Sequence, residues 1–101
     1  MTLTTHQAVV LTHLTKPNHA YAVAQEINAA GTHVIGIETC YRTVAALEKA
    51  GFIGLFPNTN PPRYEMTHEG WLALNDFAEQ QRKLIKYIEQ TYWMQQEAKY
   101  D

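Results

Sequence analysis

From about Ile37 to Gly51 the chain alternates apolar and polar positions with the spacing of an α-helix. Steps of three and four residues place four side chains on one face: Ile37, Cys40, Val44 and Leu47. The opposite face carries mostly short side chains around one arginine: Glu38, Thr39, Arg42, Ala46 and Lys49. Such a face suits a helix that another surface approaches closely, and a DNA major groove is wide enough to admit a helix. The same pattern also fits an ordinary amphipathic helix.

Two shorter helices are predicted before this segment. The first covers about residues 5–15 and ends before Pro17, because the residue that precedes a proline avoids the α region. Asn18 is expected to cap the second helix, over about residues 19–29, and Gly31 is expected to end it in a left-handed conformation. The predicted buried side of the second helix consists of Ala20, Tyr21, Val23, Ala24 and Ile27.

A β-hairpin is predicted after Gly51, which we expect to end the preceding helix in a Schellman-type cap. Residues 52–56 and 63–66 are strand candidates that flank the segment PNTNPP, whose residues all favour turns. The six-residue loop is expected to project. Side-chain alternation matches four residues across the two strands: Ile53 and Leu55 with Tyr64 and Met66.

A last, long helix is predicted from His68 to about Ala98, with Thr67 as its cap. One heptad series runs along it with polar interruptions: Leu74, Phe77, Gln81, Leu84, Ile88, Thr91 and Gln95. A second series lies beside it: Trp71, Ala78, Ile85 and Tyr92. A helix of about 30 residues is roughly 45 Å long, and the preceding chain is too short to cover it. We therefore expect a homodimer, with contacts from Leu74, Phe77, Leu84, Ile85, Ile88 and Tyr92.

The order of these elements predicts a mainly α fold with a small β-hairpin wing, a winged helix–turn–helix with a long C-terminal dimerisation helix. Residues 1–66 would form the winged-helix domain, and residues 67–101 the dimerisation helix packed on it. The chain has 101 residues, 46% of them hydrophobic and 18% charged, which suits one small globular domain.

Composition also indicates the cellular compartment in which the protein is expected. No run of about 18 apolar residues exists, so we expect no membrane span and no membrane partner. The N-terminus lacks a basic segment followed by an apolar one, so a signal peptide is not expected. Cys40 is the single cysteine, which excludes an internal disulfide and fits a reducing compartment. Together these features predict a cytoplasmic protein.

The net charge of −2, from 8 basic and 10 acidic residues, restricts the kind of nucleic-acid binding that can be expected. A negative long-range field repels phosphates, so non-specific coating of nucleic acid is disfavoured. A sequence-specific binder with a local basic patch and few phosphate contacts remains compatible with this charge.

Several short motifs in the third helix and the wing resemble those of a known protein family. In the third helix and its exit they are Thr39-Cys40-Tyr41, Val44-Ala45-Ala46-Leu47-Glu48 and Gly51-Phe52-Ile53. In the wing they are Pro61-Pro62-Arg63 and Tyr64-Glu65-Met66-Thr67, followed by Gly70. Over about residues 6–75 the chain resembles PadR-type transcriptional regulators. The resemblance implies a DNA-binding homodimer, most often a repressor, that pairs through its first and last helices.

Arg42 is the leading candidate for DNA contact, because recognition helices contact base edges near their exposed N-terminal part. The alternative is an intrahelical ion pair with Glu38, four residues earlier. Thr39 and Thr43 could contact phosphates or thymine methyl groups, and their alternative is plain solvent exposure. The resemblance adds Tyr41 as a phosphate contact, with a place in the core as the alternative.

The remaining candidates lie outside the start of that helix. Arg63 in the wing is a phosphate or minor-groove candidate, or else a solubilising charge at a strand edge. Lys49 is a weaker DNA candidate, since a lysine also stabilises a helix C-terminus. The resemblance implies that Trp71 and Trp93 could bind a small, flat apolar effector at the dimer interface, with packing as the alternative.

No motif indicates catalysis, a metal site or a cofactor. No nucleophile stands in a motif with a base, and no two of the five histidines have the i, i+4 spacing that binds metal on a helix. The function predicted is a sequence-specific transcriptional regulator, a repressor, that binds double-stranded DNA as a homodimer on a pseudo-palindromic operator. The alternatives are a winged-helix protein–protein interaction module, or an effector-binding dimer with a secondary DNA role.

Overall fold

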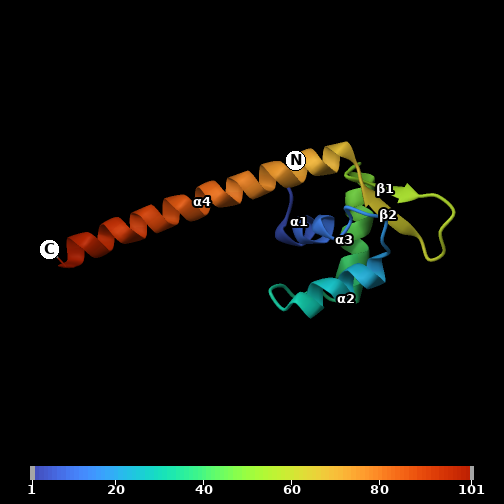
Figure 1. The fold of residues 1–101 in the computed structure, drawn as a ribbon, viewed down its shortest axis with the longest axis horizontal. Coiled ribbons are helices and arrows are strands. Elements are labelled where there is room, and N and C mark those ends of the chain that lie inside the picture. Colours follow the sequence, from blue (N-terminus) through green and yellow to red (C-terminus); the bar gives the residue numbers. More distant parts are fainter. Residues whose placement is uncertain (1, 101) are drawn as a thin grey trace.

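The computed structural model describes residues 2–100, and the side chains of residues 2–97. Three helices and a hairpin form a compact body from which one long helix projects (Figure 1). The elements are α1 (Thr5–Thr12), α2 (Ala20–Ala30), α3 (Ile37–Lys49), β1 (Ile53–Phe56), β2 (Arg63–Met66) and α4 (His68–Tyr100). The described chain spans 65 × 27 × 19 Å. None of these helices combines the length and the apolar character that crossing a bilayer would need.

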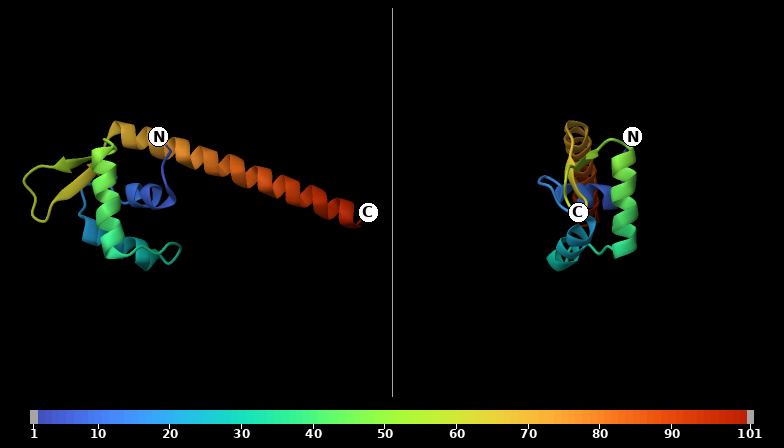
Figure 2. Two further views of the ribbon diagram at one scale, coloured as in Figure 1. Left: turned by 180° about the vertical axis from the view of Figure 1, so that it is seen from behind. Right: turned by 90° about the vertical axis from the view of Figure 1, so that its right-hand side faces the viewer.

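The hydrophobic core lies among α1, α2 and α3. Its largest fully buried side chains are Leu11, Leu14, Ile27, Leu47, Val10, Val23 and Cys40. Figure 2 shows α3 between the hairpin and α1, and α3 contacts both. The first turns of α4 close the core with the half-buried residues Ala73, Leu74 and Phe77. The order of elements and the winged-helix fold predicted from the sequence are therefore confirmed.

The start of α2 differs from the prediction. His19, and not Asn18, is the N-cap, because the His19 Nδ1 accepts a hydrogen bond from the Ala22 N–H at 3.2 Å. The backbone of Asn18 instead pairs with Tyr64 in the wing, through N···O distances of 3.0 and 2.8 Å. This pairing holds Asn18 in an extended conformation outside the helix, so α2 begins one residue later than predicted.

Two residues predicted for the buried face of a helix are exposed. Tyr21 in α2 retains 44% of its surface and Ile37 in α3 retains 46%. Both lie in the first turn of their helices, where no other element of the described chain covers them. Helical periodicity alone predicted their burial. Burial also requires a neighbouring element that packs on the same turn of the helix.

The first helix ends earlier than expected, at Thr12, yet Leu14 is fully buried. The Leu14 carbonyl accepts a hydrogen bond from the Met66 N–H at 2.7 Å. The backbone after α1 therefore pairs with the wing and does not form a further helical turn. The N-terminus of α1 has a capping box, in which Thr4 and Gln7 exchange backbone and side-chain hydrogen bonds.

The exit from α3 and the hairpin follow the prediction. Gly51 has a positive φ of 82°, its N–H donates to the Glu48 carbonyl, and the Phe52 N–H donates to the Leu47 carbonyl, each at 3.0 Å. This is a complete Schellman motif. The strands pair antiparallel with Ile53 opposite Met66 and Leu55 opposite Tyr64. The loop between them projects from the body (Figure 1).

Thr67 joins the wing to α4, as predicted for a helix cap. Its Oγ1 accepts a hydrogen bond from the Gly70 N–H at 3.1 Å and donates to the Gly51 carbonyl at 2.7 Å. Gly70 packs directly against the Phe52 backbone, where a Cβ atom would overlap the carbonyl oxygen. The direction in which α4 leaves the body is therefore set by the end of α3 and the first strand.

The turn between α2 and α3 is held by one side chain. The Asn28 amide donates to the Ile35 carbonyl and accepts from the Ile35 N–H, both at 2.8 Å. Ile35 is buried, so these two hydrogen bonds satisfy backbone groups that would otherwise lie unpaired next to the core. The clamp positions the start of α3.

Candidate nucleic-acid interface

The outer face of α3 is open to solvent. Its exposed residues are Glu38, Tyr41, Arg42, Ala45, Ala46, Glu48 and Lys49. The Arg42 guanidinium donates from Nη2 to the Thr39 Oγ1 at 3.3 Å. Among the described residues Arg42 forms no ion pair with Glu38. The intrahelical pair considered from the sequence is thus not formed, and the charge of Arg42 is available to a ligand.

The two threonines of this helix have different environments. Thr43 keeps only 9% of its surface, and its Oγ1 donates to the Thr39 carbonyl at 2.7 Å. Thr39 is half-buried, with its hydroxyl accepting from Arg42. Thr43 was considered from the sequence as a contact to phosphates or thymine methyl groups, but its side chain is buried and bonded to the helix backbone. Thr43 is therefore not among the residues proposed to contact DNA.

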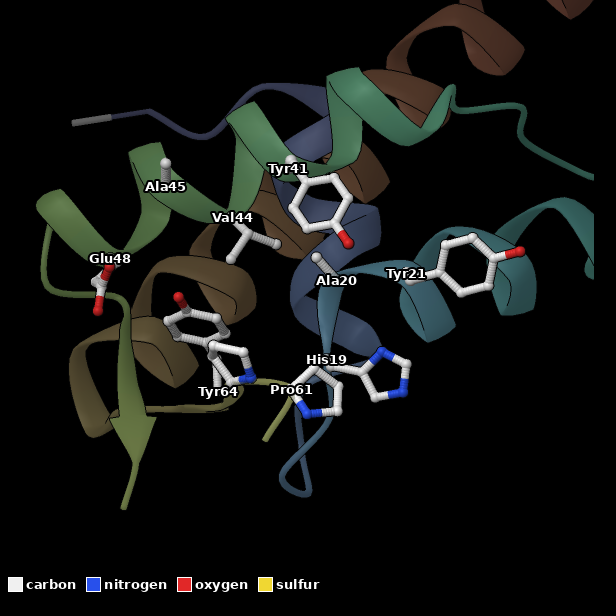
Figure 3. Close-up of a pocket in the computed structure, with 10 residues that line it drawn as sticks. His19, Ala20, Tyr21, Tyr41, Val44, Ala45, Glu48, Pro61 and Tyr64 are labelled. Atoms are coloured by element: carbon white, nitrogen blue, oxygen red, sulfur yellow. The ribbon is translucent and has the colours of Figure 1, made fainter. Parts of the chain in front are cut away.

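Tyr41 is exposed over 52% of its surface and takes no place in the core. It borders a groove of about 510 Å³ between α3, the start of α2 and the wing (Figure 3). The groove is lined by His19, Ala20, Tyr21, Tyr41, Val44, Ala45, Glu48, Pro61, Pro62 and Tyr64. Local sequence patterns do not reveal this groove, because its residues come from three segments that only the tertiary structure brings together.

The wing presents Arg63 as its first β2 residue. Its side chain is exposed, and its N–H donates to the Thr59 Oγ1 at 3.0 Å within the loop. Lys49 is exposed in the last turn of α3. Both cations are free of ion pairs among the described residues. Arg42 and Lys49 thus lie on α3, and Arg63 lies on the hairpin that α3 contacts.

Acidic residues share the same elements. Glu38 and Glu48 accompany the two cations of α3, and Glu65 accompanies Arg63 in β2. All three carboxylates are exposed. The surface therefore carries no excess of positive charge, which agrees with the overall charge of −2. Any nucleic acid would be bound through few, specific contacts and not through a broad field.

Cys40 has a structural role beneath this surface. Burial raises the pKa of the Cys40 thiol above its ordinary value. The thiol therefore stays protonated, and its Sγ donates to the Ala20 carbonyl at 3.3 Å. This bond ties the start of α2 to α3. Cys40 belongs to the apolar face predicted for this helix, and its complete burial agrees with that prediction.

The residues predicted for dimerisation fall into two groups. Leu74 and Phe77 are half-buried against the core of their own chain. The others keep between 51% and 54% of their surface on the projecting part of α4: Leu84, Ile85, Ile88 and Tyr92. The second group therefore keeps the larger share of exposed apolar surface for a partner.

The two tryptophans considered for an effector lie far apart. Trp71 is in the first turn of α4 and Trp93 is 22 residues later, which is roughly 33 Å along a helix. Trp93 is 60% exposed and packs edge-on against Tyr92, with ring centroids 5.9 Å apart. One protomer cannot bring both tryptophans to one ligand.

In the part of the chain that is described, no three potential metal ligands come together.

Solved structures resemble this chain, although no protein-family model and no curated protein matches its sequence. A transcriptional regulator from Clostridium thermocellum is 23% identical and aligns over 84% of this chain and 87% of its own, with a TM-score of 0.72. A PadR family transcriptional regulator from Eggerthella lenta is 24% identical over 85% and 80% of the two chains, with a TM-score of 0.72. A PadR family transcription regulator from Clostridium difficile is 16% identical over 86% and 98%, again at 0.72.

These likenesses show that the chain has the fold of the PadR-type regulators, over most of its length and most of theirs. The resemblance drawn from the motifs of α3 and the wing is confirmed at the level of the fold.

Proposed function

We propose that this protein is a transcriptional regulator, a repressor, that binds double-stranded DNA as a homodimer. The observation that carries the proposal is the open outer face of α3 beside the wing, with an Arg42 guanidinium that pairs with no carboxylate of the described residues. The solved structures of the same fold are described as transcriptional regulators, which supports the assignment.

In the proposed complex the α3 helices of two protomers enter successive major grooves, about 34 Å apart, on a pseudo-palindromic operator. Arg42 pairs with a guanine edge, a contact that gives about 1–3 kcal/mol of discrimination between bases. Thr39, Tyr41, Lys49 and Arg63 contact the DNA backbone and set the register. Operator binding excludes RNA polymerase from the promoter.

The homodimer of the proposal forms through α4. The exposed apolar residues beyond Phe77 recur at heptad spacing, and their own chain leaves them uncovered. A second α4 supplies the complementary apolar surface. In this dimer Trp93 would lie close to the interface, where a flat apolar effector could stack on it and alter the spacing of the two α3 helices.

Selection from a pool of random duplexes, at low salt, tests the proposal. We expect enrichment of a sequence with two related half-sites separated by one helical turn. A pool that shows no enriched sequence after repeated rounds would contradict the DNA-binding proposal. Enrichment of a single half-site would contradict the dimeric arrangement while leaving DNA binding in place.

The balanced charge of α3 favours one other candidate, a protein–protein interaction module. Glu38 and Glu48 lie on the same exposed face as Arg42 and Lys49, and mixed charges of this kind suit a protein surface better than a phosphate backbone. The duplex selection separates the two functions, because an interaction module would enrich no sequence.

A further inference from the structure

The groove beside α3 has an aromatic lining and one acidic side chain. Tyr41 and Tyr64 extend into it from α3 and the wing, and Val44 forms part of its floor (Figure 3). Glu48 lies at the end of the groove near Tyr64 (Figure 3). Its volume of about 510 Å³ falls within the range of small-molecule sites, which are lined mainly by apolar and aromatic side chains with a few polar groups.

The three walls of the groove are tied together by hydrogen bonds. Asn18 and Tyr64 pair through their backbones at 3.0 and 2.8 Å, which fixes the wing to the start of α2. The Cys40 thiol bonds to the Ala20 carbonyl at 3.3 Å, which fixes the same end of α2 to α3. The groove is therefore preformed. A ligand would bind without the entropy cost of ordering the segments that line the groove.

The charges around the groove select the kind of ligand. Among the described residues, no lysine or arginine lines the groove, and Glu48 forms no ion pair. The His19 Nδ1 accepts the capping hydrogen bond from the Ala22 N–H, so this ring nitrogen is already engaged. An anion such as a phosphate would meet the Glu48 carboxylate and no compensating lysine or arginine side chain. A cation would meet the carboxylate and the negative faces of tyrosine rings.

We propose that this groove binds a small organic cation, an aromatic or alkyl-substituted ammonium, with Glu48 as its counter-ion and Tyr41 and Tyr64 as its aromatic walls. This binding does not depend on DNA. Its consequence for DNA does rest on the proposed function: Tyr41 belongs to both surfaces, so an occupied groove would compete with DNA for the α3 face.

Amide NMR spectra of the full-length protein, titrated with benzyltrimethylammonium without DNA, test the inference. We expect saturable shifts centred on Tyr41, Glu48 and Tyr64, with much smaller shifts at Trp93. Benzenesulfonate and benzyl alcohol, which carry the same ring with a negative or no charge, should bind at least about tenfold more weakly.

Glu48→Gln should weaken binding of the ammonium at least about tenfold. Glu65→Gln is the matched control, since it removes one negative charge from an exposed wing residue outside the groove lining. Its affinity should equal that of the parent protein. Unchanged spectra for both variants away from the substituted residue would show that each retains the fold.

Several outcomes would overturn the inference. They are no saturable shift with the ammonium, equal binding of benzenesulfonate or benzyl alcohol, and equal losses in the Glu48→Gln and Glu65→Gln proteins. Shifts centred on Trp93 would place the ligand on α4 instead. Saturable binding of inorganic phosphate in the groove would identify it as part of a DNA backbone path. None of these results depends on whether the duplex selection succeeds.

Discussion

Gly70 lies in the first turn of α4, where this helix packs against the start of the wing. Replacing Gly70 tests whether the close approach of α4 to the wing contributes to stability. A Cβ atom there would overlap the backbone oxygen of Phe52 and lie 2.7 Å from the Met66 Cγ. A backbone atom cannot rotate away, so Gly70→Ala should lower the free energy of unfolding by roughly 1–3 kcal/mol. The gain of up to about 1 kcal/mol in helix propensity does not offset this.

Urea denaturation at one protein concentration measures the effect of Gly70→Ala. Gly54→Ala is the control, because a Cβ at Gly54 would meet only the Thr67 Cγ2, at an ordinary 3.9 Å. If the Gly70 and Gly54 variants unfold at the same urea concentration, the close approach of α4 to the wing does not contribute to stability.

Arg42 and Arg63 should affect DNA binding in different ways, if the proposed function holds. Arg42→Ala removes a contact to a base edge, so affinity for the selected operator should fall while affinity for a scrambled duplex changes little. Arg63→Ala removes a backbone contact, so affinity for both duplexes should fall alike and the salt dependence should become shallower. Fluorescence anisotropy over a salt series measures both. Equal effects of the two substitutions would refute this division of roles.

The turn between α2 and α3 depends on one side chain that local sequence signals did not reveal. Asn28 is exposed in the last turns of α2, yet its amide makes both hydrogen bonds to the Ile35 backbone. Its partner lies seven residues away across a glycine-containing loop. Capping and turn rules consider nearer neighbours, and so they do not identify such a clamp.

Asn28→Ala should therefore destabilise the protein by about 1–3 kcal/mol, because two backbone groups beside the core lose their partner. Hydrogen exchange at the Ile35 amide should also accelerate in this variant. Gln25→Ala, at an exposed position of the same helix, is the control and should change stability by no more than about 0.5 kcal/mol. Unaltered exchange at Ile35 in the Asn28 variant would show that the clamp does not hold the turn.

Other elements show where sequence rules sufficed. The Schellman exit at Gly51 and the Thr67 cap of α4 were predicted and are present. Each depends on residues within a few positions of one another, and the conformational preferences of glycine and threonine are strong there. The cap of α2 was predicted wrongly, since Asn18 is drawn away by a strand 46 residues later.

At the scale of the whole molecule, the main unexplained feature is the apolar surface of α4 that its own chain does not cover. The 33 residues of α4 amount to roughly 50 Å of helix, and the hydrophobic residues by which it packs on the core extend only to Phe77. The exposed apolar residues beyond that point would be costly to leave in water. Dimerisation through this segment would remove them from solvent in both copies.

Ile88→Lys tests this dimer, because a lysine at the proposed interface would bury an unpaired charge. The dimer dissociation constant should rise at least about tenfold, as measured by sedimentation. Gln90→Lys adds the same charge at a neighbouring position of α4 outside the predicted contact set and should leave the constant unchanged. An unaltered dimer in the Ile88→Lys protein would contradict pairing through this segment.

By itself, the sequence determined the order of the elements, their principal boundaries and the winged-helix class, since periodicity, caps and turn residues act over a few positions. Only the tertiary structure decided which side chains of α2 and α3 remain accessible. It turned Thr43 inward, left Tyr21 and Ile37 exposed, and kept Arg42 apart from Glu38. It also assembled the groove from α2, α3 and the wing. These features depend on contacts between distant segments, and no local pattern in the chain encodes them.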